Sequence, residues 1–313
     1  MGISFHGIME VLIIGIGGYY LITGLRKGSS AMDFLSNLVI RITLPCLVFS
    51  NLATNFAPGD IENWWAFPLL AVTINVAGAL IALGYVSIDR TVRNRGEFTA
   101  LVAFQNGTFL PLAFGSVLFG PDQLPHFLNV FFLYSFLQVP TFFTLAVWLV
   151  NADSSLGQRL KSLANPPNIA TVLGLTFALT GWSNYVPEWV LRPMSAIGSM
   201  TATLAAFFIG GIIVTNLMKA KTAEWSEPVK ATIFKCLIVP ALGALAVWWF
   251  RPPEFIALFT IMQSAMPSAL LIALVLPPDE TRQKMVAAAI LLSSLVSIIT
   301  LPLFMGIFGA LYW

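Results

Sequence analysis

Long apolar runs separated by short polar connections extend over the whole chain. A helix of about 20 apolar residues crosses the hydrocarbon core of a bilayer, and the runs here have roughly that length. The pattern predicts ten membrane-spanning helices, at 5–25, 31–53, 65–88, 98–119, 127–150, 167–183, 190–218, 230–250, 254–276 and 285–312. The connections are all brief, so we expect no soluble domain beside the membrane part. The predicted fold class is an all-α polytopic membrane protein in a lipid bilayer.

Two of these runs are interrupted by proline at corresponding places in the two halves of the chain. The run 98–119 contains Pro111 after the polar stretch 105–108, and the run 254–276 contains Pro267 between polar residues. Proline removes a backbone donor and clashes with the preceding helical turn. Unpaired backbone groups cannot face lipid, so such a break must be buried in protein or line a cavity. A matched pair of broken spans predicts the substrate site of a transporter.

Basic residues are distributed unevenly between alternate connections. Twelve follow odd-numbered runs, whereas two, Arg192 and Arg251, follow even-numbered runs. Cytoplasmic connections are enriched in Lys and Arg, so the odd-numbered connections are predicted to be cytoplasmic and both termini to lie outside. The twelve are Arg26, Lys27, Arg90, Arg93, Arg95, Arg159, Lys161, Lys219, Lys221, Lys230, Arg282 and Lys284.

The order of the spans predicts an internal repeat. Each half has five spans, an odd number, so the second half enters the membrane in the opposite orientation to the first. The interrupted runs are the fourth of each half, which is the pattern of an inverted repeat. We therefore expect two five-helix repeats, at 1–150 and 151–313, with crossed broken helices 4 and 9. Asn165 before Pro166 is expected to cap the first helix of the second repeat.

Composition agrees with a membrane protein. The chain is 58% hydrophobic and 10% charged, with mean hydropathy +0.85, whereas soluble domains carry roughly 25% charged residues. The net charge of +2 is spread over short connections, which argues against nucleic acid as a partner. Cys46 and Cys236 fall in apolar runs and are expected to be buried thiols, so we expect no metal and no cofactor. The first run lacks a basic leader and a small-residue cleavage site, and it is expected to stay as a span.

Polar residues at the first break are candidates for substrate contact. Asn106 and Thr108 lie where a half-helix starting near Leu110 would direct its unpaired N–H groups and positive dipole end at the crossover. Such an end attracts a carboxylate. The alternative is that Asn106 only caps the broken backbone.

The second break offers a matching set of polar residues around Pro267. Gln263 and Ser264 are expected to contact substrate or an ion, by the same reasoning. Ser268 either does so or bonds a carbonyl of its own helix. Two half-helix starts are thus expected to meet at mid-membrane.

Arg41 is a charge inside an apolar run. It lies about 10 residues into the second run, roughly 15 Å from the cytoplasmic end at 1.5 Å per residue. A snorkelling side chain reaches less far than that. One interpretation is a counter-charge that attracts an anionic substrate, and the other is a structural ion pair with Glu10. The sequence leaves both open.

The predicted spans lack the residues that an intramembrane enzyme or a cation–proton antiporter would need. Intramembrane hydrolysis needs two aspartates, a Ser–His pair, or His and Glu metal ligands. The spans hold no aspartate except Asp33 near a helix end, and His6 and His126 lie near the predicted outer surface. Antiport of this kind also needs buried acidic residues at the crossover, where the sequence has none. We expect a transporter and not an enzyme.

Four motifs, in order along nearly the whole chain, carry a likeness to a known family. They are Leu44–Phe49, Asn106–Pro111, Asn165–Asn168 with the following Ile169–Gly174, and Ala265–Ala269. The chain resembles the auxin efflux carrier family, which includes bacterial malate-permease-like proteins and the plant PIN auxin exporters. The resemblance implies ten helices in two inverted repeats with crossed broken helices 4 and 9, as in bile acid symporters and sodium–proton antiporters. The central loop is very short compared with plant PIN proteins, which makes auxin itself a weak candidate for the substrate.

The resemblance also implies a division of labour between helices. Spans 1, 2, 6 and 7 would form a scaffold, often a homodimer in such folds, and spans 3–5 and 8–10 a moving transport domain. In plant PIN proteins the site uses an Asn on helix 4, which Asn106 matches, and polar residues of helix 5, where Tyr134 and Gln138 lie. We expect a substrate site formed by Asn106, Gly107, Thr108, Pro111, Tyr134, Gln138, Gln263, Ser264, Met266, Pro267, Ser268 and Arg41.

The expected function is that of a secondary carrier for a small organic anion, such as a carboxylate or an auxin-like acid. It would work by alternating access, through an elevator motion, in the cell membrane. The alternative is a sodium- or proton-coupled symporter of the bile acid symporter type. The sequence leaves the substrate, the coupling ion and the direction of transport open.

Overall fold

The computed structural model describes residues 5–24, 28–57, 59, 61, 63–150, 164–220, 223–277 and 279–312. Within these ranges all regular elements are helices, and the one β-type contact is an isolated antiparallel bridge between Gln105 and Ser268. Six described stretches are long and apolar enough to cross a membrane: Ala31–Asn55, Ala66–Ile88, Leu124–Leu149, Glu188–Gly211, Ser226–Phe250 and Glu280–Tyr312. The predicted all-α class is confirmed, and these stretches agree with a protein that crosses the membrane several times.

The helices follow the apolar runs in order. Two long stretches are built from three consecutive segments each, and the other continuous helices are single segments. The first stretch comprises α2 (Gly28–Leu38), η1 (Val39–Thr43) and α3 (Leu44–Asn55), and the second α11 (Ser226–Ile233), η3 (Phe234–Ile238) and α12 (Val239–Phe250). The single segments are α1 (Phe5–Gly24), α4 (Ala66–Ile88), α7 (Leu124–Leu149), α9 (Pro166–Thr180), the short turn η2 (Trp182–Tyr185), α10 (Glu188–Ala220) and α15 (Glu280–Tyr312).

The two proline-interrupted runs are the ones that fold as separate half-helices. The first forms α5 (Arg95–Ala103) and α6 (Phe109–Leu118), and the second α13 (Glu254–Ala265) and α14 (Ile272–Val275). The breaks therefore lie where the sequence predicts them. The halves are unequal, however, because α14 has only four residues.

The start of α9 shows the predicted cap. The Asn165 side chain accepts a hydrogen bond from the backbone N–H of Asn168 at 2.9 Å, and Pro166 occupies the first turn. The cap satisfies one of the N–H groups that the first turn leaves unpaired. The helix ends at Gly181, whose φ of 73° is the left-handed conformation that favours glycine.

A π-helical turn precedes a proline in each of the two three-segment stretches. The turn η1 lies directly before Leu44-Pro45, and η3 directly before Val239-Pro240. Proline cannot donate to the carbonyl one turn earlier, so the preceding turn relaxes into a wider hydrogen-bonding pattern. Arg41 lies in η1 and Lys235 in η3. Each π turn therefore sets the direction of a basic side chain within an apolar helix.

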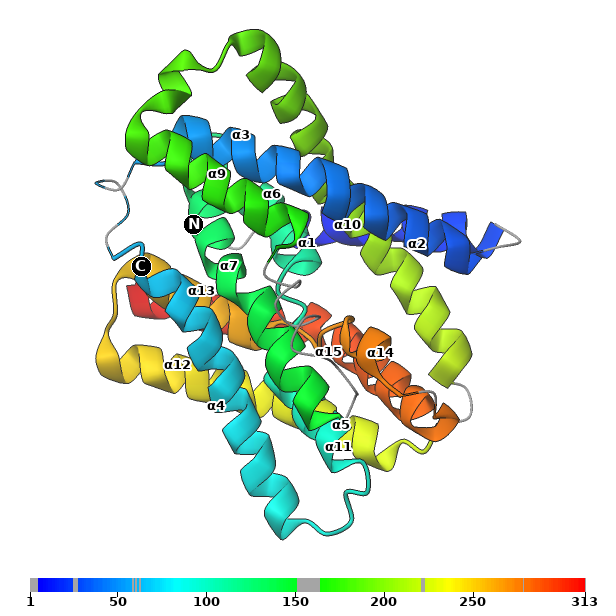
Figure 1. The fold of residues 1–313 in the computed structure, drawn as a ribbon. Helices are drawn as coiled ribbons and strands as arrows, with labels where there is room; N and C mark the ends of the chain where they lie inside the picture. Colours follow the sequence, from blue (N-terminus) through cyan, green and yellow to red (C-terminus); the bar gives the residue numbers. More distant parts are fainter. Residues whose placement is uncertain are drawn as a thin grey trace.

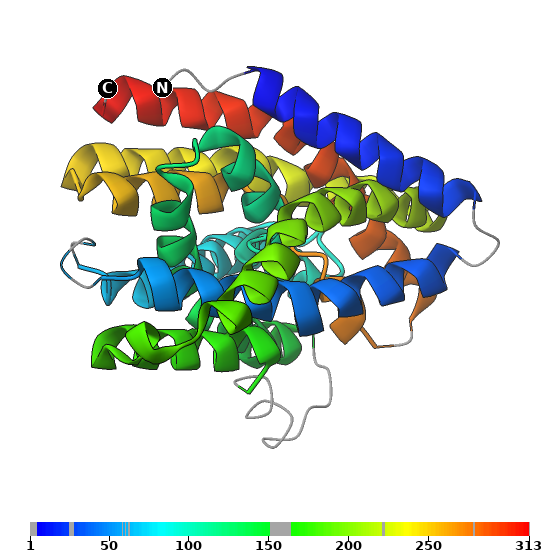
Figure 2. The same cartoon turned by 90° about the horizontal axis from the view of Figure 1, so that it is seen from above.

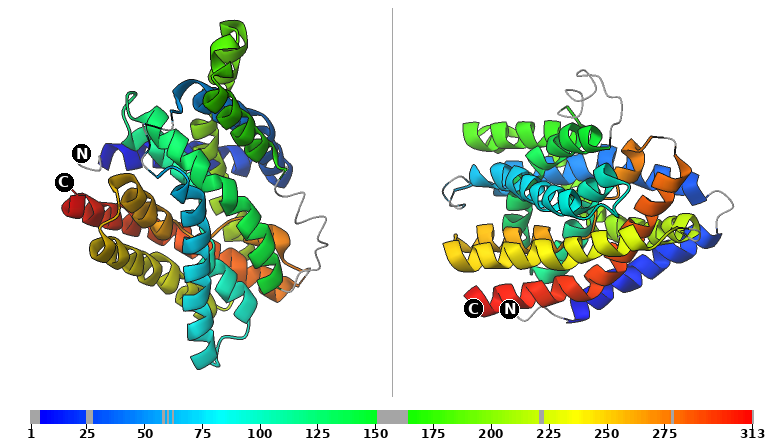
Figure 3. Two further views of the ribbon diagram at one scale, coloured as in Figure 1. Left: turned by 60° about the vertical axis from the view of Figure 1, so that its left-hand side comes forward. Right: turned by 90° about the horizontal axis from the view of Figure 1, so that it is seen from below.

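The helices assemble into two groups. In the first group α1 packs against α10, α3 lies along α9, and α10 crosses α3 (Figure 1). In the second group α4 packs against α5 and α7, α11 against α15, and α13 against α12 and α15. Figure 2 shows α12 and α13, in yellow and gold, side by side. The long α10 also contacts α6 and α15 and so joins the two groups. The start of α1 and the end of α15 lie at the same end of the molecule (Figure 3).

Glycine allows α1 and α10 to approach closely. A Cβ atom at Gly210 would overlap the Gly15 carbonyl, and one at Gly18 would overlap the Phe207 carbonyl. Membrane helices associate through such small residues because lipid provides no hydrophobic drive between them. A larger side chain at these positions would force the two helices apart.

An aromatic cluster fixes the first half of the second broken helix. Phe259 of α13 lies 5.8 Å from Phe67 of α4, and 5.5 Å and 5.9 Å from Phe127 and Tyr134 of α7, between ring centroids. These four side chains are almost completely buried, and aromatic pairs in such offset arrangements stabilise packing beyond their buried area. The cluster holds α13 against α4 and α7, and with it the break that follows Ala265.

Candidate substrate site

The two breaks meet inside the protein. The backbone N–H of Asn106 donates to the Pro267 carbonyl at 2.7 Å, and the N–H of Ala269 donates to the Phe104 carbonyl at 2.9 Å. These bonds form the antiparallel bridge between Gln105 and Ser268. Backbone groups released by each break are thus paired with the other break, as burial away from water requires. The pairing brings together the two segments that the sequence singled out.

The two prolines act differently at their breaks. Pro111 is the third residue of α6, a first-turn position where its missing N–H costs little. Pro267 follows Met266, which ends α13 in an extended conformation with ψ of 145°. The residue before a proline is disfavoured in the α region, so α13 ends there. The first proline therefore starts a half-helix and the second ends one.

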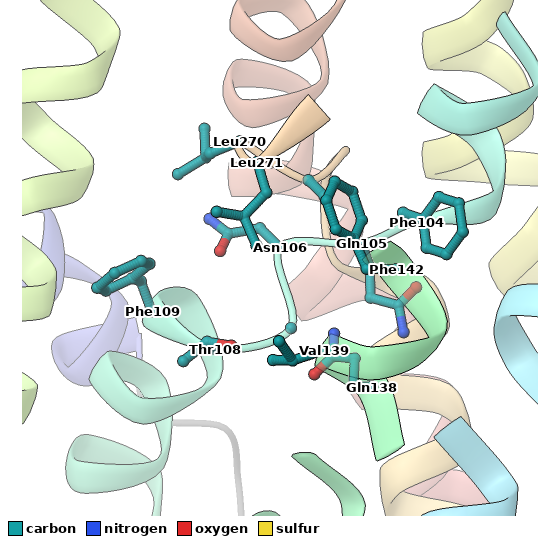
Figure 4. A pocket seen from close by; sticks show the side chains of 12 residues that line it. Phe104, Gln105, Asn106, Thr108, Phe109, Gln138, Val139, Phe142, Leu270 and Leu271 are labelled. Atoms are coloured by element: carbon teal, nitrogen blue, oxygen red, sulfur yellow. The ribbon is translucent and has the colours of Figure 1, made fainter. Parts of the chain in front are cut away.

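Gly107 lies at a close approach between the first break and the Gln138 side chain of α7. A Cβ atom at this position would overlap the carboxamide of Gln138. Figure 4 shows the Gln138 side chain beside the link that joins Asn106 to Thr108. The Gln138 Oε1 atom is buried and has no hydrogen-bond partner among the described residues. It is therefore an acceptor without a protein donor, next to the break.

A small cavity lies against this link. Its volume is about 40 Å³, and its polar lining comes from Gln105, Asn106, Thr108 and Gln138. Apolar side chains of the first break, α7 and the second break complete it (Figure 4). A cavity of this size holds water but not an organic acid of several carbons.

A much larger cavity of about 330 Å³ also reaches Asn106. It lies between α1, α6, α10 and α15, and Pro267 of the second break borders it as well. Small-molecule sites typically have volumes of about 300–1,000 Å³ and mostly apolar walls with a few polar groups. The lining residues are Ile13, Gly15, Ile16, Tyr19, Asn106, Leu110, Phe114, Ile209, Gly210, Ile213, Pro267, Ser294, Ser297 and Ile298. Asn106 is a polar residue of the first break, and it lines both cavities.

The N-terminus of α6 gives this region a positive electrostatic character. The first N–H groups of a helix have no partner within the helix, and the Thr108 side chain does not cap them. The positive end of the α6 dipole therefore points toward the link between Asn106 and Thr108. The Asn106 side chain is 7% exposed and forms no hydrogen bond with the described residues. A free carboxamide beside an uncapped helix start can donate to a carboxylate.

Some predicted site residues lie behind the breaks rather than in a cavity. Tyr134 is fully buried and accepts a hydrogen bond from Gln105 Nε2 at 2.6 Å. Gln263 is also fully buried, and neither end of its carboxamide has a partner among the described residues. Ser264 and Ser268 donate to the carbonyls of Ile261 and Leu101, at 2.9 Å and 2.8 Å.

Pro111, Met266 and Arg41, the remaining predicted residues, line neither cavity. Pro111 lies in the first turn of α6, and Met266 borders a separate void of about 10 Å³. The Arg41 side chain is exposed on η1 and borders neither cavity. Among the described residues it forms no ion pair, and the exposed Glu10 forms none either. Neither interpretation of Arg41 gains support, and both stay predictions.

Apart from Asn106 and Pro267, the sequence did not point to the walls of the larger cavity. Ile13, Ile16, Ile209 and Ile213 belong to apolar runs in which lipid-facing and cavity-facing positions look alike. The pair Ser294 and Ser297 was the available signal, since their spacing of three places them on one helix face. No group of three or more His, Cys, Asp or Glu side chains in the described part could hold a metal ion.

Comparison with known proteins identifies the family of the chain. The membrane transport protein family matches the chain over residues 3–155 and 154–305. An uncharacterized transporter of Methanothermobacter thermautotrophicus is 24% identical, over 96% of this chain and 97% of its own. A second uncharacterized transporter, from Methanocaldococcus jannaschii, is also 24% identical, over 95% and 96%. Protein PIN-LIKES 7 of Arabidopsis thaliana is 22% identical, over 96% and 95%. With nearly its whole length matched, the chain belongs to the membrane transport protein family, that of the auxin efflux carriers.

Proposed function

We propose that the protein is a secondary carrier that moves a small organic anion across the cell membrane by alternating access. The observation that carries this proposal is Asn106, an unpaired carboxamide at the meeting point of two broken helices that borders both cavities. Broken helices of this kind form the substrate sites of transporters. No catalytic role is proposed for any residue.

Ten spans in two inverted repeats are the topology we propose. The broken pair α5–α6 is the fourth span of the first half, and α13–α14 is the fourth of the second. The two stretches matched by the family, 3–155 and 154–305, divide the chain close to the proposed boundary between 1–150 and 151–313. The start of α1 and the end of α15 lie at one end (Figure 3), as an even number of crossings requires. The uneven basic residues favour that end being outside.

The two helix groups are candidates for the scaffold and the moving domain. The scaffold would be α1, α2–α3, α9 and α10, and the transport domain α4–α7 and α11–α15. The larger cavity lies between α1 and α10 of one group and α6 and α15 of the other. That is where a carrier working by relative motion would hold its substrate. We also propose that the scaffold forms the homodimer that the family resemblance implies.

The lining of the cavities favours one class of anion. Asn106 and the uncapped start of α6 offer donors for one carboxylate, while the rest of the larger cavity is mostly apolar. No Lys or Arg among the described residues borders either cavity, so a second carboxylate would lack a counter-charge. We therefore propose a monocarboxylate with an apolar or aromatic body as the substrate, rather than a small dicarboxylate such as malate.

A panel of radiolabelled acids tests this proposal in proteoliposomes. Purified protein should take up an aromatic or branched monocarboxylate, and a hundredfold excess of malate should compete poorly. Sodium and pH gradients, applied separately, would test the alternative of a coupled symporter. Preferred uptake of malate would contradict the substrate class, and no uptake or exchange of any organic anion would contradict the carrier function.

A further inference from the structure

Lys235 is a fully buried lysine that the proposed site does not use. It lies in η3, within the stretch formed by α11, η3 and α12, and its exposed fraction is 0%. Its Nζ atom donates to the Val102 carbonyl at 3.3 Å, and no carboxylate of the described residues pairs with it. A buried charge without a partner is costly, so its presence calls for a physical reason.

The position of Lys235 is fixed by its neighbours in η3. The Phe234 ring packs against those of Tyr85 and Phe98, tilted in the first pair and edge-to-face in the second, at 4.4 Å and 6.0 Å between ring centroids. These contacts anchor one side of the turn. On the other side the Cys236 thiol donates to the Ser293 carbonyl at 3.5 Å. The ammonium group is thus held in place by packing on both sides of the turn.

The same region is bonded directly to the crossed breaks. Ser293 Oγ accepts from the backbone N–H of Ser268 at 3.3 Å, and Ser268 Oγ donates to the Leu101 carbonyl at 2.8 Å. Lys235 bonds the next carbonyl, that of Val102. Two consecutive carbonyls in the last turn of α5 therefore receive side-chain donors. These are carbonyls that a helix end leaves without a partner inside the helix.

A cation is the expected ligand of such a helix end. The C-terminus of a helix carries partial negative charge, and the C-terminal ends of half-helices hold coupling cations in transporters with broken helices. Lys235 brings an ammonium group to this place at the end of α5, covalently attached to the chain. A sodium ion would compete with it for the same carbonyl.

We propose that Lys235 is a built-in counter-cation of the crossed breaks, which favours the bound anion and makes a sodium ion unnecessary. This inference rests on the proposed function, because it assigns a charge to the same substrate site. Lys235 is then a positioning residue. It acts on the bound anion through the electrostatic potential at the breaks and does not touch the substrate.

The acidic groups of the neighbouring helices do not neutralise this charge. Glu97 of α5 pairs with Arg282 of α15. Glu227 of α11 accepts hydrogen bonds from the backbone N–H groups of Arg93 and Asn94. The described chain therefore offers no carboxylate partner to a protonated Lys235. Arrival of an anion would offset the cost of burying the charged form.

Binding measurements on purified protein test the inference. The wild type should bind an aromatic monocarboxylate with equal affinity in sodium chloride and in choline chloride. Lys235→Met replaces the lysine by an unbranched, uncharged side chain that is one atom shorter. It should weaken carboxylate binding at least tenfold and leave binding of the neutral amide analogue unaffected. Lys235→Arg should retain most of the affinity. Lys230→Met removes a lysine of the same stretch that pairs with Asp89 at 2.7 Å, and it should bind like the wild type.

Three results would overturn the inference. The first is a wild-type affinity for the carboxylate that rises severalfold in sodium chloride. The second is an unchanged carboxylate affinity in Lys235→Met. The third is an equal loss of affinity for the carboxylate and the amide in that variant, which would indicate a purely structural lysine. If Lys235→Met does not fold, the affinity of the wild type in sodium chloride, compared with that in choline chloride, still tests the inference. Failure of the proposed function looks different, because the wild type then binds no organic anion in either salt.

Discussion

Asn51 on α3 and Asn129 on α7 are joined side chain to side chain, with Asn51 Nδ2 donating to Asn129 Oδ1 at 2.7 Å. Asn129 Nδ2 in turn donates to the Asn55 carbonyl at 2.7 Å. These amides are buried among apolar helices, and they connect the proposed scaffold with the proposed transport domain. If the two groups move relative to each other, this connection must break in every transport cycle.

Cross-linking this connection should therefore stop transport. In a variant without Cys46 and Cys236, Asn51→Cys and Asn129→Cys joined by a short thiol cross-linker should abolish uptake, and reduction of a cleavable linker should restore it. The matched control is Phe49→Cys with Phe177→Cys, whose native rings lie 5.5 Å apart on α3 and α9 of one group. That cross-link should leave uptake intact. Full uptake with positions 51 and 129 linked would contradict the motion between the two groups.

Gly107→Ala should destabilise the protein and disturb the site, because its Cβ atom would overlap the Gln138 carboxamide. Overpacking of this kind costs about 1–3 kcal/mol, measurable by thermal unfolding in detergent. Gly84→Ala is the control, since a Cβ atom there meets nothing within 4 Å, and it should be neutral or stabilising by about 0.5–1 kcal/mol. The double variant Gly107→Ala with Gln138→Ala should regain much of the loss. Equal stability of the two glycine variants would argue against the close approach.

Filling the larger cavity should block the substrate. Ser297 is 4% exposed and borders that cavity, so Ser297→Phe should lower substrate affinity at least tenfold, or about 1.4 kcal/mol. Ile299→Phe, on the same helix at a side chain that is 74% exposed, should bind like the wild type. Both variants should elute normally in size-exclusion chromatography. Unchanged affinity in Ser297→Phe would mean that the substrate does not occupy this cavity.

The proposed topology predicts which cysteines a membrane-impermeant reagent reaches in intact cells. Gly59→Cys and Pro252→Cys should be labelled from outside, whereas Arg93→Cys should react only after the membrane is opened. The physical reason is the excess of Lys and Arg in the connections that follow odd-numbered spans. Labelling of position 93 in intact cells would show that the chain has the opposite orientation to the one proposed.

The sequence predicted the parts of the fold that depend on local backbone chemistry. Pro111 and Pro267 mark the two breaks because a missing N–H acts at its own position, whatever the surroundings. Asn165 marks the start of α9 for a similarly local reason. The meeting of the two breaks was expected from their matching order in the two halves, and the bridge between Gln105 and Ser268 agrees with that expectation.

The features that escaped prediction depend on which way a side chain points around its helix. Hydropathy does not tell a lipid-facing isoleucine from one that lines a cavity, so Ile13 and Ile209 gave no signal. Lys235 and Arg41 are both basic residues in apolar runs, yet Lys235 is buried and Arg41 exposed. The four-residue length of α14 was not anticipated either, so the second half-helix start offers a much weaker dipole than that of α6.

The central claim is that the organic anion binds at Asn106, and calorimetric titration of purified variants tests it most directly. Asn106→Ala removes a carboxamide bonded to a charged ligand, a loss of about 1.5–3 kcal/mol or roughly tenfold to hundredfold in affinity. The control is Asn37→Ala, which alters an exposed asparagine that donates to the Asp33 carbonyl of its own helix. The account predicts wild-type affinity for Asn37→Ala and a loss of at least tenfold for Asn106→Ala, with both proteins folded. Equal affinities for the two variants would contradict it and reduce Asn106 to a part of the broken backbone.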